Sequence, residues 1–258
     1  MNDTNTEHIK LYRSVLRSID ENDKSKRRSG YRLGGEMRIG LVVAGFPPDR
    51  IGGAELQCRQ LAVQLVKAGH EVVVFTRRFS AERPSRELQN GYEIRRRAII
   101  PIPGLRLVWD TIFAVIQVIR CRPCVDVLLA YQTINSGFVA VLAKCLSGVP
   151  AVISIRGNEE YIIGSSFLKR AAVSAAYRGA SAIAVQTPLI ERELLVSFKP
   201  WVDEPFMEML RAKIKVVPNG IAVPTNPSKA GDYVLYVGRL IENKGVADLL
   251  DAVRGQAR

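Results

Sequence analysis

Residues 37–76, MRIGLVVAGFPPDRIGGAELQCRQLAVQLVKAGHEVVVFT, decide the fold of this 258-residue chain. Arg38–Ala44 is a near-continuous apolar run, which is typical of a strand that is covered on both faces. From Ala54 onward the apolar residues recur at helical spacing, and Val72–Phe75 is a second apolar run. A strand, a helix and a strand this close together form one right-handed crossover unit of a parallel sheet. The stretch therefore predicts an α/β fold.

The loop between the first strand and the helix is the first candidate ligand site. Its glycines, Gly52 and Gly53, permit a tight turn directly before the helix. In open parallel sheets ligands bind beyond the carboxyl ends of the strands, and a helix amino end can bring backbone N–H groups close to a phosphate or a sugar. We therefore take Gly52 and Gly53 as candidate binding residues, with a plain tight turn as the alternative. The stretch carries no G-x-G-x-x-G dinucleotide fingerprint.

The rest of the chain repeats the alternation of strand and helix. Further strands are predicted at Tyr92–Ile100, Val125–Ala130, Ala151–Ile155, Ala182–Val185, Ile214–Val217 and Tyr233–Val237. Helices are predicted at Leu105–Arg120, Ile134–Leu146, Phe167–Arg178, Pro188–Phe198, Trp201–Arg211 and around Val246–Val253. This order is that of a Rossmann-like, doubly wound parallel sheet.

The same pattern divides the chain into four segments. Residues 1–36 are expected to be a flexible extension, with a short amphipathic helix for a membrane surface or a partner as the alternative. Residues 37–221 form the main domain, and 222–232 read as a linker. Residues 233–258 begin a second Rossmann-like unit, which one strand and one helix cannot complete.

Charge narrows the choice of partners. The net charge is +12, with basic clusters at Arg77-Arg78 and Arg95–Arg97. No aromatic residues interleave with them, which argues against nucleic acid as a partner. Anionic lipid or an anionic small molecule stays open, although the simplest interpretation of each cluster is a solvated strand end or helix face.

The cysteine and histidine residues do not predict a redox, metal-binding or catalytic site. The four cysteines read as small core residues of a reducing compartment, and Cys121-x-x-Cys124 lacks the second ligand pair of a zinc site. His70 stands at the start of a strand, away from the ligand edge, so a structural role is expected. No metal site is predicted.

The ends and the apolar segments bear on localisation. The amino terminus is polar, with no apolar core of a signal peptide after it. The apolar helix Leu107–Ile119 is too short to span a bilayer. A cytoplasmic protein is therefore expected, with peripheral contact at a membrane surface left open.

Three separated stretches carry a resemblance to one family. They are Arg38–Val72 with Phe46-Pro47-Pro48 and Gly52–Glu55, then Val217–Ile221 (VPNGI), then Tyr236–Leu240 (YVGRL) followed by Asn243-Lys244-Gly245. In this order the chain resembles the GT-B glycosyltransferases of family 4 over about residues 37–258. The resemblance implies retaining transfer of a sugar from a nucleotide-sugar donor to a glycan, lipid-linked or small acceptor. It also implies no metal, no cofactor and no obligatory protein nucleophile.

The resemblance assigns roles to individual residues. Arg239 and Lys244 match the pair that binds the donor diphosphate, where positive charge meets the charge that develops on the leaving group. Arg156 and Asn158 follow the strand Ala151–Ile155 and match positions that face the cleft, so they are candidates for acceptor or donor-sugar contacts. A pair that only caps the loop is the alternative.

One departure from the family pattern concerns the donor side. Family members carry a pair of glutamates further along the second domain, and this sequence ends at Arg258 before that segment. We therefore expect a chain truncated early in its C-terminal, donor-binding domain, with its activity in this short form in doubt. A non-catalytic Rossmann-like module that binds a partner or a membrane, and a nucleotide-sugar epimerase, are the alternative functions.

Overall fold

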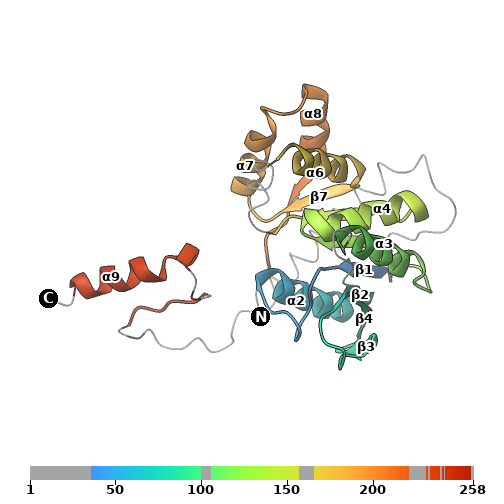
Figure 1. The fold of residues 1–258 in the computed structure, drawn as a ribbon, viewed down its shortest axis with the longest axis horizontal. Helices are drawn as coiled ribbons and strands as arrows, with labels where there is room; N and C mark the ends of the chain where they lie inside the picture. Colours follow the sequence, from blue (N-terminus) through green and yellow to red (C-terminus); the bar gives the residue numbers. More distant parts are fainter. Residues whose placement is uncertain are drawn as a thin grey trace. The chain divides into compact units, whose positions relative to one another are not determined.

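A computed structural model describes residues 36–99, 106–156, 166–220, 231, 233–238, 240 and 242–256. By its contacts the chain divides into two compact units, Met1–Ala222 and Val223–Arg258. Figure 1 shows the sheet and its covering helices in the first unit. The second unit contributes the short turn η3 (Glu242–Lys244) and the helix α9 (Val246–Gln256).

The first unit is built on one eight-stranded sheet in the order β3-β4-β2-β1-β5-β6-β7-β8. All neighbouring strands run parallel except the pair β3 and β4. This sheet confirms the predicted Rossmann-like α/β class. The strands are β1 (Arg38–Val42), β2 (Glu71–Arg78), β3 (Arg86–Gln89), β4 (Tyr92–Ala98), β5 (Val127–Tyr131), β6 (Ala151–Ser154), β7 (Ala182–Val185) and β8 (Ile214–Val216).

Helices cover both faces of the sheet because strand residues alternate between two apolar faces. Ile39 and Leu41 of β1 pack into the core under α2, whereas Val42 packs into the core under α3 and α4. A third core holds β7 under α6, α7 and α8, and Figure 1 shows these three helices grouped around that strand. The helices are α2 (Gly53–Lys67), α3 (Arg106–Ile119), α4 (Phe138–Ser147), α6 (Phe167–Gly179), α7 (Pro188–Phe198) and α8 (Glu204–Lys213).

The order of the strands creates a switch in direction beside β1. The chain runs outward from β1 through β2 to β4, and then returns to β5 on the other side of β1. The loops that follow the neighbouring strands β1 and β5 therefore lead to helices on opposite faces of the sheet, α2 on one face and α4 on the other. In open α/β sheets this is the point where a crevice opens for ligands.

Two local predictions were wrong because turn chemistry was overlooked. The strand β3 was not predicted, although Asn90 and Gly91 have φ values of 47° and 82° and form the turn of a β3–β4 hairpin. The predicted helix at Ile134 begins instead at Phe138, since Asn135 has φ 73° and ψ −76° within the turn η2 (Thr133–Gly137).

The start of α8 also differs from the prediction. The helix begins at Glu204 rather than Trp201, because the Asp203 carboxylate accepts a hydrogen bond of 3.1 Å from the Phe206 N–H.

The predicted strand Tyr233–Val237 is not a strand. Its described residues lack strand structure, and Tyr233, Val234, Leu235 and Val237 are exposed. A strand needs a neighbour for its backbone hydrogen bonds, and the described part of the second unit supplies none. The helix expected within residues 1–36 and most of the expected linker lie outside the described residues.

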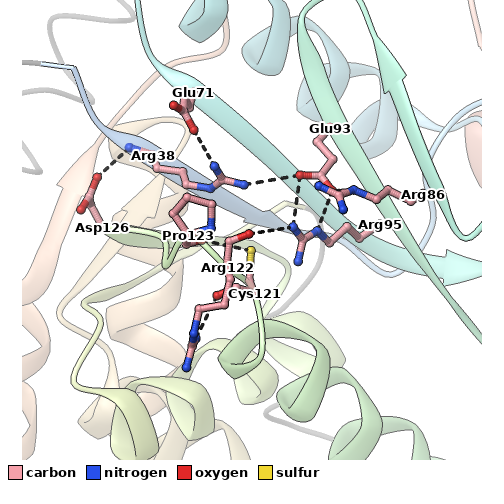
Figure 2. Close-up of polar contacts among 9 residues, drawn as sticks. All are labelled: Arg38, Glu71, Arg86, Glu93, Arg95, Cys121, Arg122, Pro123 and Asp126. Atoms are coloured by element: carbon pink, nitrogen blue, oxygen red, sulfur yellow. Dashed lines mark hydrogen bonds and ion pairs between the residues drawn. The ribbon is translucent and has the colours of Figure 1, made fainter.

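An ionic network joins the amino ends of three strands, as Figure 2 shows. Arg38 on β1 donates to Glu71 on β2 at 2.6 Å and lies 3.4 Å from Glu93 on β4. Glu93 also accepts from Arg95 at 2.7 Å and pairs with Arg86. Arg95 is therefore not the solvated side chain that the sequence suggested.

The cysteine and histidine residues near this edge have structural surroundings. Cys58 and Cys121 are buried, and burial raises the pKa of the Cys121 thiol. Cys124 and Cys145 are exposed, so the prediction that all four cysteines are core residues was wrong for these two. The Nδ1 atom of His70 accepts a hydrogen bond of 3.3 Å from the backbone N–H of Met37, just before β1. These contacts agree with the structural interpretation of the C-x-x-C and of His70.

We predict that Glu93→Gln destabilises the protein by about 2 kcal/mol at neutral pH, because it leaves three arginines facing one neutral group. Burial alone would raise the pKa of Glu93, but Arg95 and Arg86 outweigh burial and lower it. The ionised Glu93 therefore contributes fully above its ordinary pKa of 4.5, and its contribution is lost as the pH falls through the lower folded-state pKa.

Urea unfolding at several pH values measures this effect. Glu71→Gln is the matched control, since the Glu71 side chain is 58% exposed and that of Glu93 only 13%. Equal losses for both variants, or a loss for Glu93→Gln that persists unchanged at pH 3, would contradict the account.

Candidate functional site

The predicted site residues fall into three groups. Gly52, Gly53 and Arg156 lie at the carboxyl edge of the sheet in the first unit. Lys244 ends the turn η3 in the second unit, with an exposed side chain. Arg239 and Asn158 lie outside the described residues.

The loop between β1 and α2, called the glycine loop here because it ends at Gly52 and Gly53, has an unstrained backbone at Gly52. Gly52 caps α2 with φ −153° and ψ 177°, an extended conformation that any residue adopts. No side chain caps the helix at this position, and a Cβ built on Gly53 would meet no atom within 4 Å. Gly53 thus leaves open space at the first turn of α2, whereas a Cβ on Gly52 would lie 2.5 Å from Glu55 Oε2, so the Glu55 carboxylate stands beside the amino end of the helix.

The same loop is held in place at its start. The Phe46 side chain is buried, and its ring meets the Tyr92 ring edge-to-face with 6.1 Å between the centroids. The N–H of Arg50 donates to the Phe46 carbonyl at 3.2 Å. Further along, the Asp49 carboxylate accepts from Arg83 at 3.0 Å. An anchored start and an open end suit a loop that positions a ligand.

Arg156 is the most constrained of the predicted residues. It follows β6 and is only 7% exposed. Its Nε donates to Ser154 Oγ at 3.0 Å, its Nη1 donates to Asn219 Oδ1, and its guanidinium carbon lies 5.0 Å from the centroid of the Tyr131 ring. Arg156 therefore ties together the carboxyl ends of β5, β6 and β8.

Ser154, Asn219 and Tyr131 are uncharged groups that orient the Arg156 guanidinium. Burial raises the pKa of the Cys58 thiol in α2, and the positive charge of Arg156 opposes that rise. Cys58 stays a protonated, fully buried thiol, and this rules it out as a nucleophile. Arg156 is therefore an oriented, positively charged side chain close enough to α2, the helix that begins at Gly53, to act on Cys58.

The turn η2 after β5 lines the other side of the switch point. Gln132 and Asn135 have φ values of 74° and 73°, which non-glycine residues seldom adopt. The Gln132 N–H donates to the Ser154 carbonyl at 2.9 Å, and Thr133 Oγ1 lies 3.1 Å from the Tyr177 hydroxyl. Such conformations persist where the surroundings enforce them, which is common at binding sites.

A second basic group lies at the same edge on the face covered by α3. Arg77 of β2 and Arg97 of β4 both contact the Asp110 carboxylate of α3. Their side chains are 14% and 13% exposed, so the interpretation of these arginines as solvated strand ends was wrong.

Sequence reasoning missed two residues of this edge. Asp110 was seen only as an interruption of an apolar helix, although its carboxylate binds two arginines. Asn219 belongs to the VPNGI stretch but was given no contact, although it accepts from Arg156. The available signal for Asp110 was a carboxylate on an otherwise apolar helix face, which needs a cationic partner when it is buried.

The described residues contain neither a metal-binding cluster nor a membrane-spanning helix. No group of three or more His, Cys, Asp and Glu side chains is placed there to hold a metal ion. No helix among those residues has the length and apolar character needed to cross a membrane.

Together these features define a Rossmann-like ligand-binding domain, with its binding groups gathered at the switch point of a parallel sheet. The particular family follows from comparison with known sequences. Residues 52–220 match the family described as a glycosyl transferase 4-like domain. The chain therefore belongs to the glycosyltransferases of family 4, as the resemblance predicted.

Known proteins of similar sequence and structure agree with this family. An uncharacterized glycosyltransferase of Methanocaldococcus jannaschii is 25% identical over 249 residues, with 84% of this chain and 59% of that protein covered. Sucrose-phosphate synthase of Thermosynechococcus elongatus has a TM-score of 0.54 at 17% identity, covering 71% of this chain and 48% of the other.

A third similar structure is the catalytic domain of starch synthase IV of Arabidopsis thaliana. Its TM-score is 0.55 at 12% identity, with 73% of this chain and 52% of that domain covered. At these identities the structural likeness shows a shared fold. The chain spans between about half and three-fifths of the length of these relatives.

We predict that Arg156 and Asn219 are energetically coupled. In a double-mutant cycle of Arg156→Gln and Asn219→Ala, the coupling free energy of unfolding should be about 1 to 2 kcal/mol, because the two side chains share a charge-assisted hydrogen bond. Urea unfolding of the four proteins measures it. Strictly additive losses would contradict the pairing.

Proposed function

We propose that this protein transfers a sugar from a nucleotide-sugar donor to a glycan, lipid-linked or small acceptor, with retention of configuration at the sugar. The observation that carries the proposal is the buried, oriented Arg156 at the carboxyl edge of a family 4 glycosyltransferase domain. Its charge acts on Cys58 of α2, the helix that begins at Gly53. A sugar and a phosphate are the groups that such an edge can bind through backbone N–H donors and a guanidinium.

A nucleotide-sugar is the donor that fits best. The starch synthase structure of similar fold is described as bound to ADP and acarbose. Departure of a nucleoside diphosphate puts negative charge on the leaving phosphate, and cations placed there lower the barrier. In this proposal Arg239 and Lys244 bind the diphosphate, Arg through its planar fork and Lys as a point charge.

The first unit supplies the acceptor side in this proposal. Gly52 and Gly53 bind the transferred sugar or the acceptor in this proposal, with open space at Gly53, and Arg156 orients a hydroxyl or an anionic group of either. Asn158 takes part in the same contacts. The donor is a UDP-, GDP- or ADP-hexose, and transfer needs neither a metal ion nor a protein nucleophile. The reaction takes place in the cytoplasm.

We predict that Arg239→Ala combined with Lys244→Ala lowers the rate of nucleoside diphosphate release at least a hundredfold, because each lost charge–phosphate contact contributes about 2 kcal/mol or more. The assay follows diphosphate release from UDP-, GDP- and ADP-sugars by the full-length natural polypeptide, with a panel of acceptors.

Arg254→Ala is the matched control, since Arg254 is another exposed cation of the second unit. Full activity in the double variant would overturn the role given to Arg239 and Lys244. Formation of an isomer or a free nucleotide without an acceptor would favour the epimerase, and no turnover together with capture of a partner would favour the non-catalytic module.

We also propose that the first unit contacts an anionic membrane surface. Phe167 and Trp201, which are 73% and 55% exposed, line one surface groove between α6 and the start of α8, and Leu168, next to Phe167 in the sequence, is 78% exposed. The Arg170 guanidinium lies 3.9 Å from the centroid of the Trp201 ring, and Arg178 lines the same groove. Aromatic and aliphatic side chains next to cations match the interface of an anionic bilayer.

We predict that the protein sediments with vesicles that contain anionic lipid and not with zwitterionic vesicles. Phe167→Ser combined with Leu168→Ser should reduce the bound fraction about tenfold, because two exposed apolar anchors are lost. Leu146→Ser combined with Leu189→Ser, which changes exposed leucines of α4 and α7, is the control. Equal binding by both double variants would refute the assignment of this surface.

A further inference from the structure

Two residues at the turn η2 hold backbone conformations that side chains strongly disfavour. Gln132, directly after β5, has φ 74° and ψ 145°, a combination that is nearly reserved for glycine. Asn135 has φ 73° and ψ −76°, as in the rare, strained form of γ-turn. Among the other described non-glycine residues, only Asn90 of the β3–β4 hairpin has a positive φ. Two of these three residues therefore lie at the switch point of the sheet.

Backbone contacts on both sides enforce the conformation of Gln132. Its N–H donates to the Ser154 carbonyl at 2.9 Å, and its own carbonyl accepts from the Gly137 N–H at 3.0 Å. A Cβ on Gly137 would lie only 3.2 Å from that carbonyl, so the chain returns closely to Gln132. The next residue, Thr133, is fully buried, and its Oγ1 lies 3.1 Å from the Tyr177 hydroxyl. The fold therefore maintains the strain at Gln132.

The strained side chains differ in exposure from their polar neighbours. Gln132 and Asn135 are half-buried, whereas Thr133 and Ser136, whose φ values are negative, are buried. The Gln132 side chain does not cap the turn that follows it. A glycine would adopt the backbone of Gln132 without strain, so what the glutamine adds is an amide group at the ligand edge of the sheet. Strain that is maintained for a polar side chain at such an edge indicates a ligand contact.

Asn135 does not offer the same opportunity. It lines the hollow beside Arg77, Arg97 and Asp110, whose volume of about 10 Å³ admits no more than one water molecule. Gln132 does not line this hollow. Gln132 is therefore the strained residue of this turn to which a ligand contact can be assigned.

We propose that Gln132 is a ligand-binding residue whose side-chain amide binds a carbohydrate hydroxyl group, on the transferred sugar or on the acceptor. An amide offers both donors and an acceptor, and a sugar hydroxyl can use both kinds of contact. Ser154 places Gln132 beside the predicted binding residue Arg156, because the Ser154 carbonyl accepts from Gln132 and its Oγ accepts from Arg156 Nε. This inference rests on the proposed function, because it names a residue that recognises the carbohydrate at the same site.

The competing interpretation is a turn whose glutamine has only a structural role. The two interpretations differ in how stability and sugar binding change together. If the strain serves ligand binding, a glycine at position 132 makes the protein more stable and its sugar binding weaker. If the glutamine side chain stabilises the turn, a glycine lowers the stability and leaves sugar binding unchanged.

The experiment compares Gln132→Gly, which removes both the strain and the amide, with Gln132→Met, which removes only the amide. Gln132→Gly should raise the melting temperature by about 2 to 4 °C, because relief of strain exceeds the added entropy of the unfolded chain. Gln132→Met should melt within about 1 °C of the wild type. Both variants should weaken sugar binding about fivefold, because one hydrogen bond to the sugar is lost.

Sugar binding is measured on the full-length natural polypeptide in two ways. Saturation-transfer NMR follows the binding of methyl α-glucoside, maltose and octyl glucoside, and steady-state kinetics with UDP-, GDP- and ADP-sugars gives the KM for each of these acceptors. Binding of the nucleoside diphosphates themselves should not change in either variant. Asn90→Gly is the matched control, because it also places glycine at a positive φ but in the β3–β4 hairpin, and it should leave sugar binding unchanged.

The outcomes separate this inference from the proposed function. Unchanged KM and sugar affinity in both Gln132 variants would overturn the inference, while glycosyl transfer by the wild type would still stand. A lower melting temperature for Gln132→Gly, or no binding of any of the three sugars to the wild type, would also overturn it. Sugar binding that depends on Gln132 without any turnover would leave the binding residue in place and refute the proposed transfer.

Discussion

The parallel pairing of β1 with β2 on one side and with β5 on the other is the constraint on which the rest of the structure depends. Parallel strands gather all their carboxyl ends at one edge, and the return of the chain to β5 opens that edge beside β1. The glycine loop, the turn η2 and Arg156 all follow from this arrangement, because each comes directly after one of these strands or the next.

The two edges of the sheet use arginine in different ways. At the amino edge, Arg38, Arg86 and Arg95 meet the carboxylates of Glu71 and Glu93, and these ion pairs join strands. At the carboxyl edge, the contacts of Arg156 with Ser154, Asn219 and Tyr131 are uncharged, and a pair of arginines shares one carboxylate. Oriented arginine side chains at the ligand edge suit the anionic groups of a sugar donor and an acceptor.

Much of the fold could be predicted from the sequence, because apolar runs and helical spacing report burial directly. The pattern at Arg38–Phe75 gave β1, α2 and β2 within a few residues. The apolar pattern could not predict which charged residues pair, because Arg97 and Asp110 come together only where the strand β4 packs against the helix α3. The strand predicted at Tyr233–Val237 is absent although its apolar pattern suits a strand. A strand needs a neighbouring strand to pair with, and the local pattern does not report whether one is present. The family resemblance supplied Arg239 and Lys244, which periodicity alone does not distinguish from other surface cations.

The central claim is that the acceptor and the transferred sugar bind at the carboxyl edge of the sheet, around the switch between β1 and β5. Amide hydrogen exchange measured by mass spectrometry, with and without a nucleotide-sugar and its acceptor, tests it most directly. The account predicts added protection in residues 45–56 and 131–137 and near Arg156, with the amino-edge segment around Glu93 and Arg95 unchanged. Protection confined to the amino edge, or none at the carboxyl edge when turnover is observed, would contradict it.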